Sequence, residues 1–206
     1  MEREPASHWD RVYSTHSPDA VSWYQPHATL SLDLIRRIAA GAAVRVIDVG
    51  GGASTLVDDL LASGSGEVTV LDLSASALRV AQERLGAAAA RVHWIAADIT
   101  QVELQPAAYD IWHDRAVFHF LTDPRDRAAY VAQVRRAVRP GGHVIVAAFG
   151  PQGPQQCSGL PVVRYEPGAL HAQFGDRFTL VDHLTEQHRT PGGSIQQFVY
   201  CHCVMH

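Results

Sequence analysis

The sequence predicts an α/β fold with a doubly wound, mostly parallel sheet of seven strands, helices on both faces and an antiparallel hairpin at the C-terminal end. From about residue 44, β-branched apolar runs alternate with segments of helical periodicity, which is typical of right-handed βαβ crossovers. After Phe149 the pattern changes to two long strand-like segments. No repeat or interdomain linker interrupts the chain, so a single domain over residues 1–206 is expected.

Five parallel strands are expected, of which the first is an apolar, β-branched run. They cover residues 44–49, 68–71, 92–96, 109–113 and 143–149. Residues 177–188 and 194–205 are two further strands, joined through the turn at 190–193. Strands joined by so short a connection are antiparallel, so the sheet is expected to close with a hairpin.

Helices are expected in the connections between the strands. Thr55 opens the first of them, Ser74 caps the second, and Asp123 before a proline begins the third. A Pro-Gly-Gly turn at residues 140–142 is expected to end the third helix. A short helix is also expected over residues 166–173.

Composition excludes several classes of protein. Hydrophobic residues make up 47% of the 206 residues and charged residues 18%, which excludes a disordered chain. All 17 basic residues are arginine, which excludes a lysine Schiff base, a lysine general base and a P-loop lysine. With a net charge of −4 and no basic run longer than two residues, no nucleic-acid partner is expected.

Location and assembly receive only broad expectations. No apolar run approaches the roughly 18 residues of a membrane span, so no membrane association is expected. Residues 1–5 are charged and lack the apolar segment of a secretory signal, which favours a cytoplasmic location. The oligomeric state is left open.

Glycines and carboxylates follow the first three strands, at the edge where an open parallel sheet binds its ligands. Glycines in the first turn allow a ligand to approach the backbone closely. Carboxylates at the next two strand ends can accept hydrogen bonds from ribose hydroxyls and from an adenine amino group. The candidate residues at this edge are Asp48, Gly50, Gly51, Gly52, Asp72 and Asp98.

The glycine spacing distinguishes between two nucleoside cofactors. A dinucleotide site needs G-x-G-x-x-G, but the position of its last glycine is Thr55 here. Asp48 precedes the glycines, and a carboxylate in this turn would repel a pyrophosphate. The same carboxylate suits the ammonium of a methionine tail. The sequence therefore favours S-adenosylmethionine over NAD as the cofactor, with S-adenosylhomocysteine as its product.

These segments resemble the successive motifs of class I S-adenosylmethionine-dependent methyltransferases. The motif-bearing residues are 46–53, 70–74, 96–99, 109–115 and 139–142. The resemblance covers roughly residues 40–150, with residues 41–150 as the cofactor-binding core, and implies a seven-stranded sheet. It also implies that Asp48 and the three glycines hold the methionine part. By the same resemblance Asp72, followed by Leu73, binds the ribose, and Asp98 with Ile99 holds the adenine. Ser54 replaces a glycine that is usual in the family.

The N-terminal segment, residues 1–40, is similar to the start of several enzymes of this family, including some protein-lysine methyltransferases. In those enzymes the segment folds over the cofactor as a lid. The similarity implies cofactor contacts for Trp9, Tyr13 and Trp23. A packed amphipathic extension is the alternative.

Methyl transfer from a sulfonium is an in-line displacement, so the enzyme mainly positions two reactants and excludes water. A base is required only for an acceptor that arrives protonated. His113 and His119, in and just after the fourth strand, are the candidate catalytic residues, with structural roles as the alternative. Asp114 and Arg115 are expected near the methionine tail or the acceptor, Asp114 as a cofactor-binding residue. Residues 151–206 are expected to supply an acceptor-side loop and the closing strands.

The three cysteines suggest either core packing or a soft metalloid site. Cys201 and Cys203 share one face of a strand about 7 Å apart, too far for a simple disulfide. Buried cysteine commonly packs as a small hydrophobe, so packing is favoured and no metal is expected. Cys157 lies in the acceptor-side loop and keeps the metalloid alternative open.

The sequence therefore predicts a methyltransferase with a small-molecule acceptor. A protein-lysine methyltransferase is the first alternative, although residues 114–119 depart from the Asp-Lys-Gly-Thr-Leu-Asp pattern that those enzymes tend to carry. A nucleoside-binding module without catalytic activity is the second.

Overall fold

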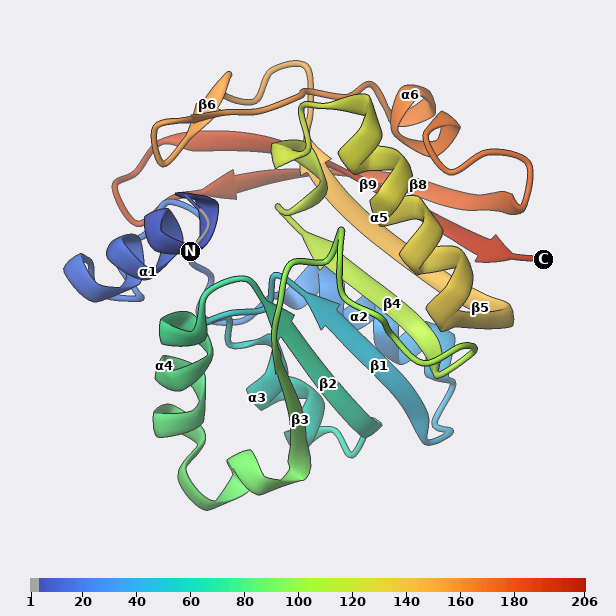
Figure 1. Ribbon diagram of the computed structural model, residues 1–206, viewed down its shortest axis with the longest axis horizontal. Helices are drawn as coiled ribbons and strands as arrows, with labels where there is room; N and C mark the ends of the chain where they lie inside the picture. Colours follow the sequence, from blue (N-terminus) through green and yellow to red (C-terminus); the bar gives the residue numbers. More distant parts are fainter. Residues whose placement is uncertain (1–3) are drawn as a thin grey trace.

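The computed structural model describes residues 4–206 (Figure 1). Met1, Glu2 and Arg3, part of the segment used for the predicted location, lie outside the described residues. The main sheet has seven strands in the order β3-β2-β1-β4-β5-β9-β8. They are β1 (Val44–Val49), β2 (Gly66–Asp72), β3 (Val92–Ala96), β4 (Tyr109–Arg115), β5 (Val138–Phe149), β8 (Phe178–Arg189) and β9 (Ile195–Met205). The first five are parallel to one another, and β9 is antiparallel to both β5 and β8. This confirms the predicted fold class.

Helices cover both faces of the sheet (Figure 1). The helices α2 (Thr29–Ala39), α3 (Leu56–Ala62) and α4 (Ala75–Leu85) cover one face, and α5 (Pro124–Ala137) and α6 (Pro167–Ala172) cover the other. Neighbouring residues of a strand point to opposite faces. In β1, Val46 therefore packs with the first group of helices and Ile47 with the second. Each face thus has its own hydrophobic core.

The strand order reverses at β1, which has β2 on one side and β4 on the other. The connections from these two strands leave in opposite directions, and a crevice forms beyond their carboxyl ends. The helix α1 (Glu4–Thr15) lies at this end of the sheet and contacts α4 (Figure 1). The helix α1 therefore borders this crevice.

Two of the three predicted helix caps are confirmed. The Ser74 hydroxyl accepts a hydrogen bond from the Ala77 backbone N–H, and Asp123 accepts one from Arg125. Thr55 precedes α3 without capping it, because its hydroxyl donates to the carbonyl of Gln25 instead. That bond ties the segment before α2 to the start of α3.

The end of α5 and one small hairpin differ from the sequence prediction. The helix α5 ends at Ala137 and β5 begins at Val138, so the Pro-Gly-Gly segment lies within a long irregular strand. The positive φ of Gly141, 73°, and a register shift opposite β4 accommodate it. A small separate hairpin, β6 (Gln156–Cys157) with β7 (Leu160–Pro161), was not expected. Its strands are too short to show a periodic pattern.

Candidate active site

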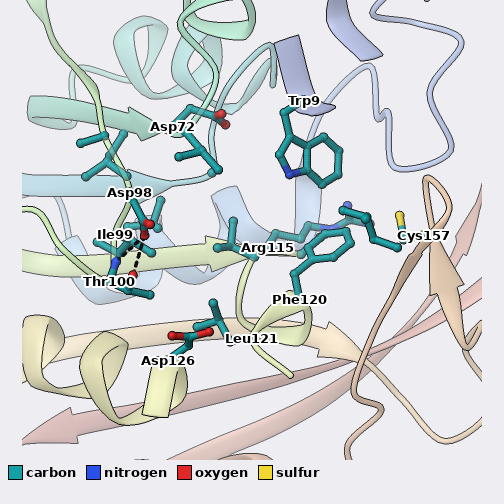
Figure 2. Close-up of a pocket in the computed structure, with 18 of the residues that line it drawn as sticks. Trp9, Asp72, Asp98, Ile99, Thr100, Arg115, Phe120, Leu121, Asp126 and Cys157 are labelled. Carbon is teal, nitrogen blue, oxygen red and sulfur yellow. Dashed lines mark hydrogen bonds between the residues drawn. The ribbon is translucent and has the colours of Figure 1, made fainter. Parts of the chain in front are cut away.

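A cavity of about 940 Å³ opens at the carboxyl ends of the parallel strands, with α1 along one side. Eight of the predicted cofactor-binding residues line it: Trp9, Tyr13, Trp23, Gly50, Asp72, Leu73, Asp98 and Ile99. Figure 2 shows Asp98 and Ile99 on one side of this cavity and Trp9, Phe120 and Cys157 on the other. The structure thus brings together residues from five separate segments of the chain.

The glycine turn after β1 fits closely against the carboxylates around it. A Cβ on Gly51 would lie 2.5 Å from Asp48 Oδ2, and one on Gly52 would lie 2.7 Å from Asp72 Oδ2. Gly50 and Gly52 have φ values of 71° and 38°, which favour glycine. Side chains at these positions would fill the space beside both carboxylates, so the turn keeps them accessible to a ligand.

Asp72 ends β2 and lines the cavity. One of its oxygens accepts a hydrogen bond of 2.7 Å from the Ser74 backbone N–H. Burial, with smaller contributions from Asp48 and Asp10, raises the pKa of Asp72 to about 7. Further hydrogen-bond donors, such as vicinal ribose hydroxyls, would stabilise its ionised form.

Asp98 lies beyond the end of β3 and also lines the cavity. Its Oδ1 accepts hydrogen bonds from the backbone N–H and hydroxyl of Thr100, and its Oδ2 accepts one from Gln101. These bonds hold the carboxylate in one orientation. Ile99, which follows it, is buried and presents an apolar surface to the same region.

Aromatic rings from the N-terminal segment close one side of the cavity. The Trp9 ring centroid lies 5.7 Å from that of Trp23 and 5.1 Å from that of Phe120, both edge-on. Tyr13 packs edge-on against Trp23, and burial raises the pKa of its phenol. The amphipathic α1 is therefore packed and is also part of the cavity wall, and its contacts with a cofactor stay a prediction.

A smaller pocket of about 50 Å³, here called the side pocket, adjoins the cavity and shares with it Tyr13, Trp23, Gly50 and Arg115. Asp48, Gly51 and His113 also line the side pocket. It thus holds one carboxylate and one guanidinium.

Asp114 was predicted to bind the cofactor, but the structure places it outside the described lining of both pockets. It is fully buried, and it accepts hydrogen bonds from the backbone N–H groups of Val117 and Phe118 and from the Tyr130 hydroxyl. Burial raises its pKa to about 6 despite these donors. Asp114 therefore shapes the turn after β4. Arg115, the next residue, reaches the cavity.

His119 also differs from its expected position. It is fully buried and does not belong to the described lining of either pocket. Its ring lies 4.6 Å from that of Phe120 and 4.4 Å from that of Phe149, and its Nδ1 accepts from the Phe149 backbone N–H. Burial, assisted by Arg115, lowers its pKa to about 3. A ring that stays neutral and enclosed is poorly placed to accept a proton from a substrate.

His113 is buried beside Asp48, at the side pocket rather than the main cavity. Its Nδ1 lies 2.7 Å from Asp48 Oδ1, and its Nε2 lies 2.8 Å from the Ser31 hydroxyl. Both ring nitrogens thus have protein partners. This arrangement fits a residue that positions Asp48 better than one that abstracts a proton.

Several cavity residues were not singled out from the sequence. They are Val49, Leu71, Ala97, Thr100, Gln101, Ala116, Val117, Phe120, Leu121, Thr122, Asp126, Leu160 and Pro161. The usable signal was the apolar run that follows β4, because loops at the switch point of a sheet line its crevice. Ala116 begins that run with a φ of 80°, an uncommon value for alanine that turns the chain along the cavity wall.

A family model described as a methyltransferase domain matches residues 46–142. A ubiquinone biosynthesis O-methyltransferase from Aromatoleum aromaticum is 36% identical over 121 residues, covering 58% of this chain and 50% of that protein. Residues 46–142 are thus similar to a methyltransferase domain, and this relative is named as a methyltransferase. It spans about half the length of the curated relatives it matches.

Solved structures share the fold of this chain. One, from work on the conversion of a disulfide bond into a thioacetal group during echinomycin biosynthesis, aligns with 98% of this chain and 93% of its own, with a TM-score of 0.77 and 20% identity. The Burkholderia thailandensis 1,6-didemethyltoxoflavin-N1-methyltransferase, with bound 1,6-didemethyltoxoflavin and S-adenosylhomocysteine, aligns with 100% of this chain and 90% of its own. Its TM-score is 0.68 at 18% identity. At these identities the likeness concerns the fold alone.

Cys157, Cys201 and Cys203 are all buried and free. Cys201 and Cys203 lie on one face of β9 in the core beneath α5 and α6, which agrees with the packing role predicted for them. Cys157 lines the cavity, and burial raises its pKa to about 11, so its thiol is protonated at neutral pH. Within residues 4–206 no cluster of three or more His, Cys, Asp or Glu side chains could hold a metal ion, and none of the helices could cross a membrane.

Proposed function

We propose that this chain is an S-adenosylmethionine-dependent methyltransferase that acts on a small-molecule acceptor. The main support is Asp72, a buried carboxylate that lines the cavity beyond the glycine turn and whose pKa is about 7. Burying such a group costs free energy unless a ligand supplies hydrogen bonds. The ribose hydroxyls of a nucleoside supply two.

The remaining contacts of the cofactor follow from the same geometry. Asp98 and Ile99 would border the adenine, and the side pocket would take the amino-acid end. Asp48 and Arg115 in that pocket complement an ammonium and a carboxylate, although Arg115 also pairs with Glu186. When bound, S-adenosylmethionine supplies the electrophilic methyl group. A pyrophosphate in the same place would face the Asp48 carboxylate, which disfavours NAD.

The acceptor would occupy the apolar part of the cavity, bordered by Trp9, Phe120, Leu121, Leu160 and Pro161. Its volume and closed aromatic side suit a compact molecule with an apolar or aromatic body. A relative is named as a ubiquinone biosynthesis O-methyltransferase, which also favours a small acceptor. The α1 aromatic side would exclude water from the transfer.

Proton removal from the acceptor has no ready base among the described lining residues of this part of the cavity. Cys157 and Tyr13 are protonated at neutral pH, and Asp126 lies on the exposed first turn of α5. We therefore infer that His119 is not a general base and that the enzyme acts by positioning the acceptor and the cofactor alone. The acceptor would present an atom that already has a free lone pair at neutral pH.

The test is methyl transfer from S-adenosylmethionine with a labelled methyl group. The chain is incubated with thiols, amines, phenols and metalloid oxyanions, and separately with a cell lysate. Label in a small molecule supports the proposal. Label in lysate protein alone would favour the protein-lysine alternative, and binding without transfer would favour the nucleoside-binding module. A cytoplasmic location stays a prediction.

A further inference from the structure

A chain of hydrogen bonds connects the carboxylate at the glycine turn with the segment that carries Trp23. It begins at Asp48 and His113, which are opposite each other in the pairing of β1 with β4. His113 Nδ1 lies 2.7 Å from Asp48 Oδ1, and His113 Nε2 lies 2.8 Å from Ser31 Oγ in α2. All three side chains are buried.

The series of hydrogen bonds continues across the sheet. Ser31 Oγ lies 3.3 Å from the Tyr200 hydroxyl, which accepts a hydrogen bond of 3.1 Å from Arg115 Nε. Arg115 also donates to Glu186 and to the carbonyl of Trp23. Gln25 donates to Glu186 as well, at 2.6 Å. The bonds thus run from the first strand to the cavity wall.

The direction of the central bond is fixed by chemistry. A carboxylate oxygen only accepts, so His113 Nδ1 must carry the proton and donate to Asp48. Ser31 holds the other nitrogen and thereby sets the rotation of the ring. A carboxylate that accepts one hydrogen bond from a fixed donor keeps its other oxygen available for a cation. Asp48 Oδ2 is also the atom that a Cβ on Gly51 would meet, so it faces the glycine turn.

We propose that His113 is a positioning residue, held by Ser31, that orients the Asp48 carboxylate toward the ammonium group of the cofactor's amino-acid end. This inference rests on the proposed function, because it requires that end to lie in the side pocket. His113 then touches neither the transferred methyl group nor the acceptor. Its contribution is confined to the amino-acid end of the ligand.

Two ligands separate this role from a general effect on folding. S-adenosylhomocysteine has the amino-acid end, whereas 5′-methylthioadenosine lacks it and keeps the ribose and adenine. The expected result for His113→Leu is a loss of about tenfold or more in affinity for S-adenosylhomocysteine, the scale of a hydrogen bond to a charged group. Its affinity for 5′-methylthioadenosine should stay within about twofold of the wild-type value, because that ligand makes no contact with Asp48.

Matched variants complete the experiment. His113→Asn keeps a side-chain donor near Asp48 and should recover part of the lost affinity. The double variant Asp48→Asn with His113→Leu should lose little more affinity for S-adenosylhomocysteine than Asp48→Asn alone. Both substitutions act on the same contact, between Asp48 and the ammonium group. His202→Leu removes another buried histidine, one outside the described lining of both pockets, and should leave the ratio of the two affinities unchanged. Ser31→Ala repeats the test with a smaller change should His113→Leu fail to fold.

Equal losses for both ligands in His113→Leu and Ser31→Ala would overturn the inference and leave His113 a structural residue. A wild-type chain that binds 5′-methylthioadenosine but gains nothing from the amino-acid end would overturn it too, while the nucleoside site stands. A wild-type chain that binds neither ligand would overturn the proposed function itself. The three results differ, so the two proposals fail separately.

Discussion

The carboxylate of Asp10 in α1 accepts a hydrogen bond of 2.6 Å from the hydroxyl of Ser74, the residue that caps α4. Asp10 also accepts one of 3.2 Å from the Ser76 backbone N–H. Burial acts in the opposite direction, but these bonds hold the pKa of Asp10 below its ordinary value. Ser74 lies two residues after Asp72, so α1 is bonded directly to the turn that carries the proposed ribose ligand.

The first prediction concerns this contact. Asp10→Ala should loosen α1, since it removes the acceptor for both donors. We expect faster proteolysis between α1 and α2, and an affinity for S-adenosylhomocysteine that is roughly two- to tenfold lower, the scale of one or two lost hydrogen bonds. Asp10→Asn keeps an acceptor oxygen, so its proteolysis rate and its affinity should lie between those of the wild-type protein and Asp10→Ala. Unchanged proteolysis and affinity in Asp10→Ala would show that the bond does not hold α1 in place.

The second prediction is that Asp72→Asn stabilises the free protein and weakens ligand binding. The raised pKa of about 7 means that the folded protein binds a proton between about pH 4 and 7 that the unfolded chain has released. The stability of the wild-type protein therefore falls as the pH rises through this interval. Asp72→Asn should raise the melting temperature at pH 8 and change it little at pH 4.

The same variant should bind the ligand more weakly, although it is more stable. We expect Asp72→Asn to lose about 1.5–3 kcal/mol of affinity for S-adenosylhomocysteine, the scale of hydrogen bonds to a charged group. Wild-type affinity should rise with pH through about 7, where the carboxylate ionises, and that rise should disappear in the variant. Calorimetry that finds equal affinities in the two proteins would refute the ribose assignment.

The third prediction concerns His119. Deleting its buried ring in His119→Ala should cost about 2–4 kcal/mol of stability, as for other large-to-small core substitutions. Because its folded pKa of about 3 is below the unfolded value of 6.5, its contribution to stability is lost as the pH falls from about 6.5 to 3. His119→Phe should remove this pH dependence. Turnover per folded molecule should stay within a few-fold of the wild-type value in both variants. A stable variant without turnover would restore a catalytic role for His119.

The fourth prediction concerns the core cysteines. Cys201→Ala and Cys203→Ala should each lower the free energy of unfolding by about 1 kcal/mol, because each removes one buried heavy atom from the sheet core. The purified protein should contain no metal by elemental analysis. Lost activity at unchanged stability would instead support a role for these thiols in chemistry.

The strands and the position of Asp72 at the cavity could be predicted because both follow from short-range patterns. Apolar, β-branched runs that alternate with helical segments marked the parallel strands, and Asp72 followed from its place at a strand end. The direction of the chain after β4 could not be predicted, because it depends on Asp114 accepting two backbone N–H groups in a tight turn. That turn buries His119 and exposes Phe120 to the cavity.

Long-range polar contacts were equally beyond the sequence. The bonds from Asp10 to Ser74 and from His113 to Ser31 join residues 64 and 82 positions apart. No spacing rule encodes them, since they depend on the packing of α1 and α2 against the finished sheet. The sequence therefore predicted which residues gather at the crevice better than it predicted which of them face the ligand.

The central claim is tested most directly by calorimetric titration of the wild-type chain with S-adenosylhomocysteine and with NAD under the same conditions. The account predicts saturable binding of S-adenosylhomocysteine with one site per chain, and no measurable binding of NAD, because Asp48 disfavours a pyrophosphate. Binding of NAD with equal or higher affinity, or no binding of S-adenosylhomocysteine, would contradict it.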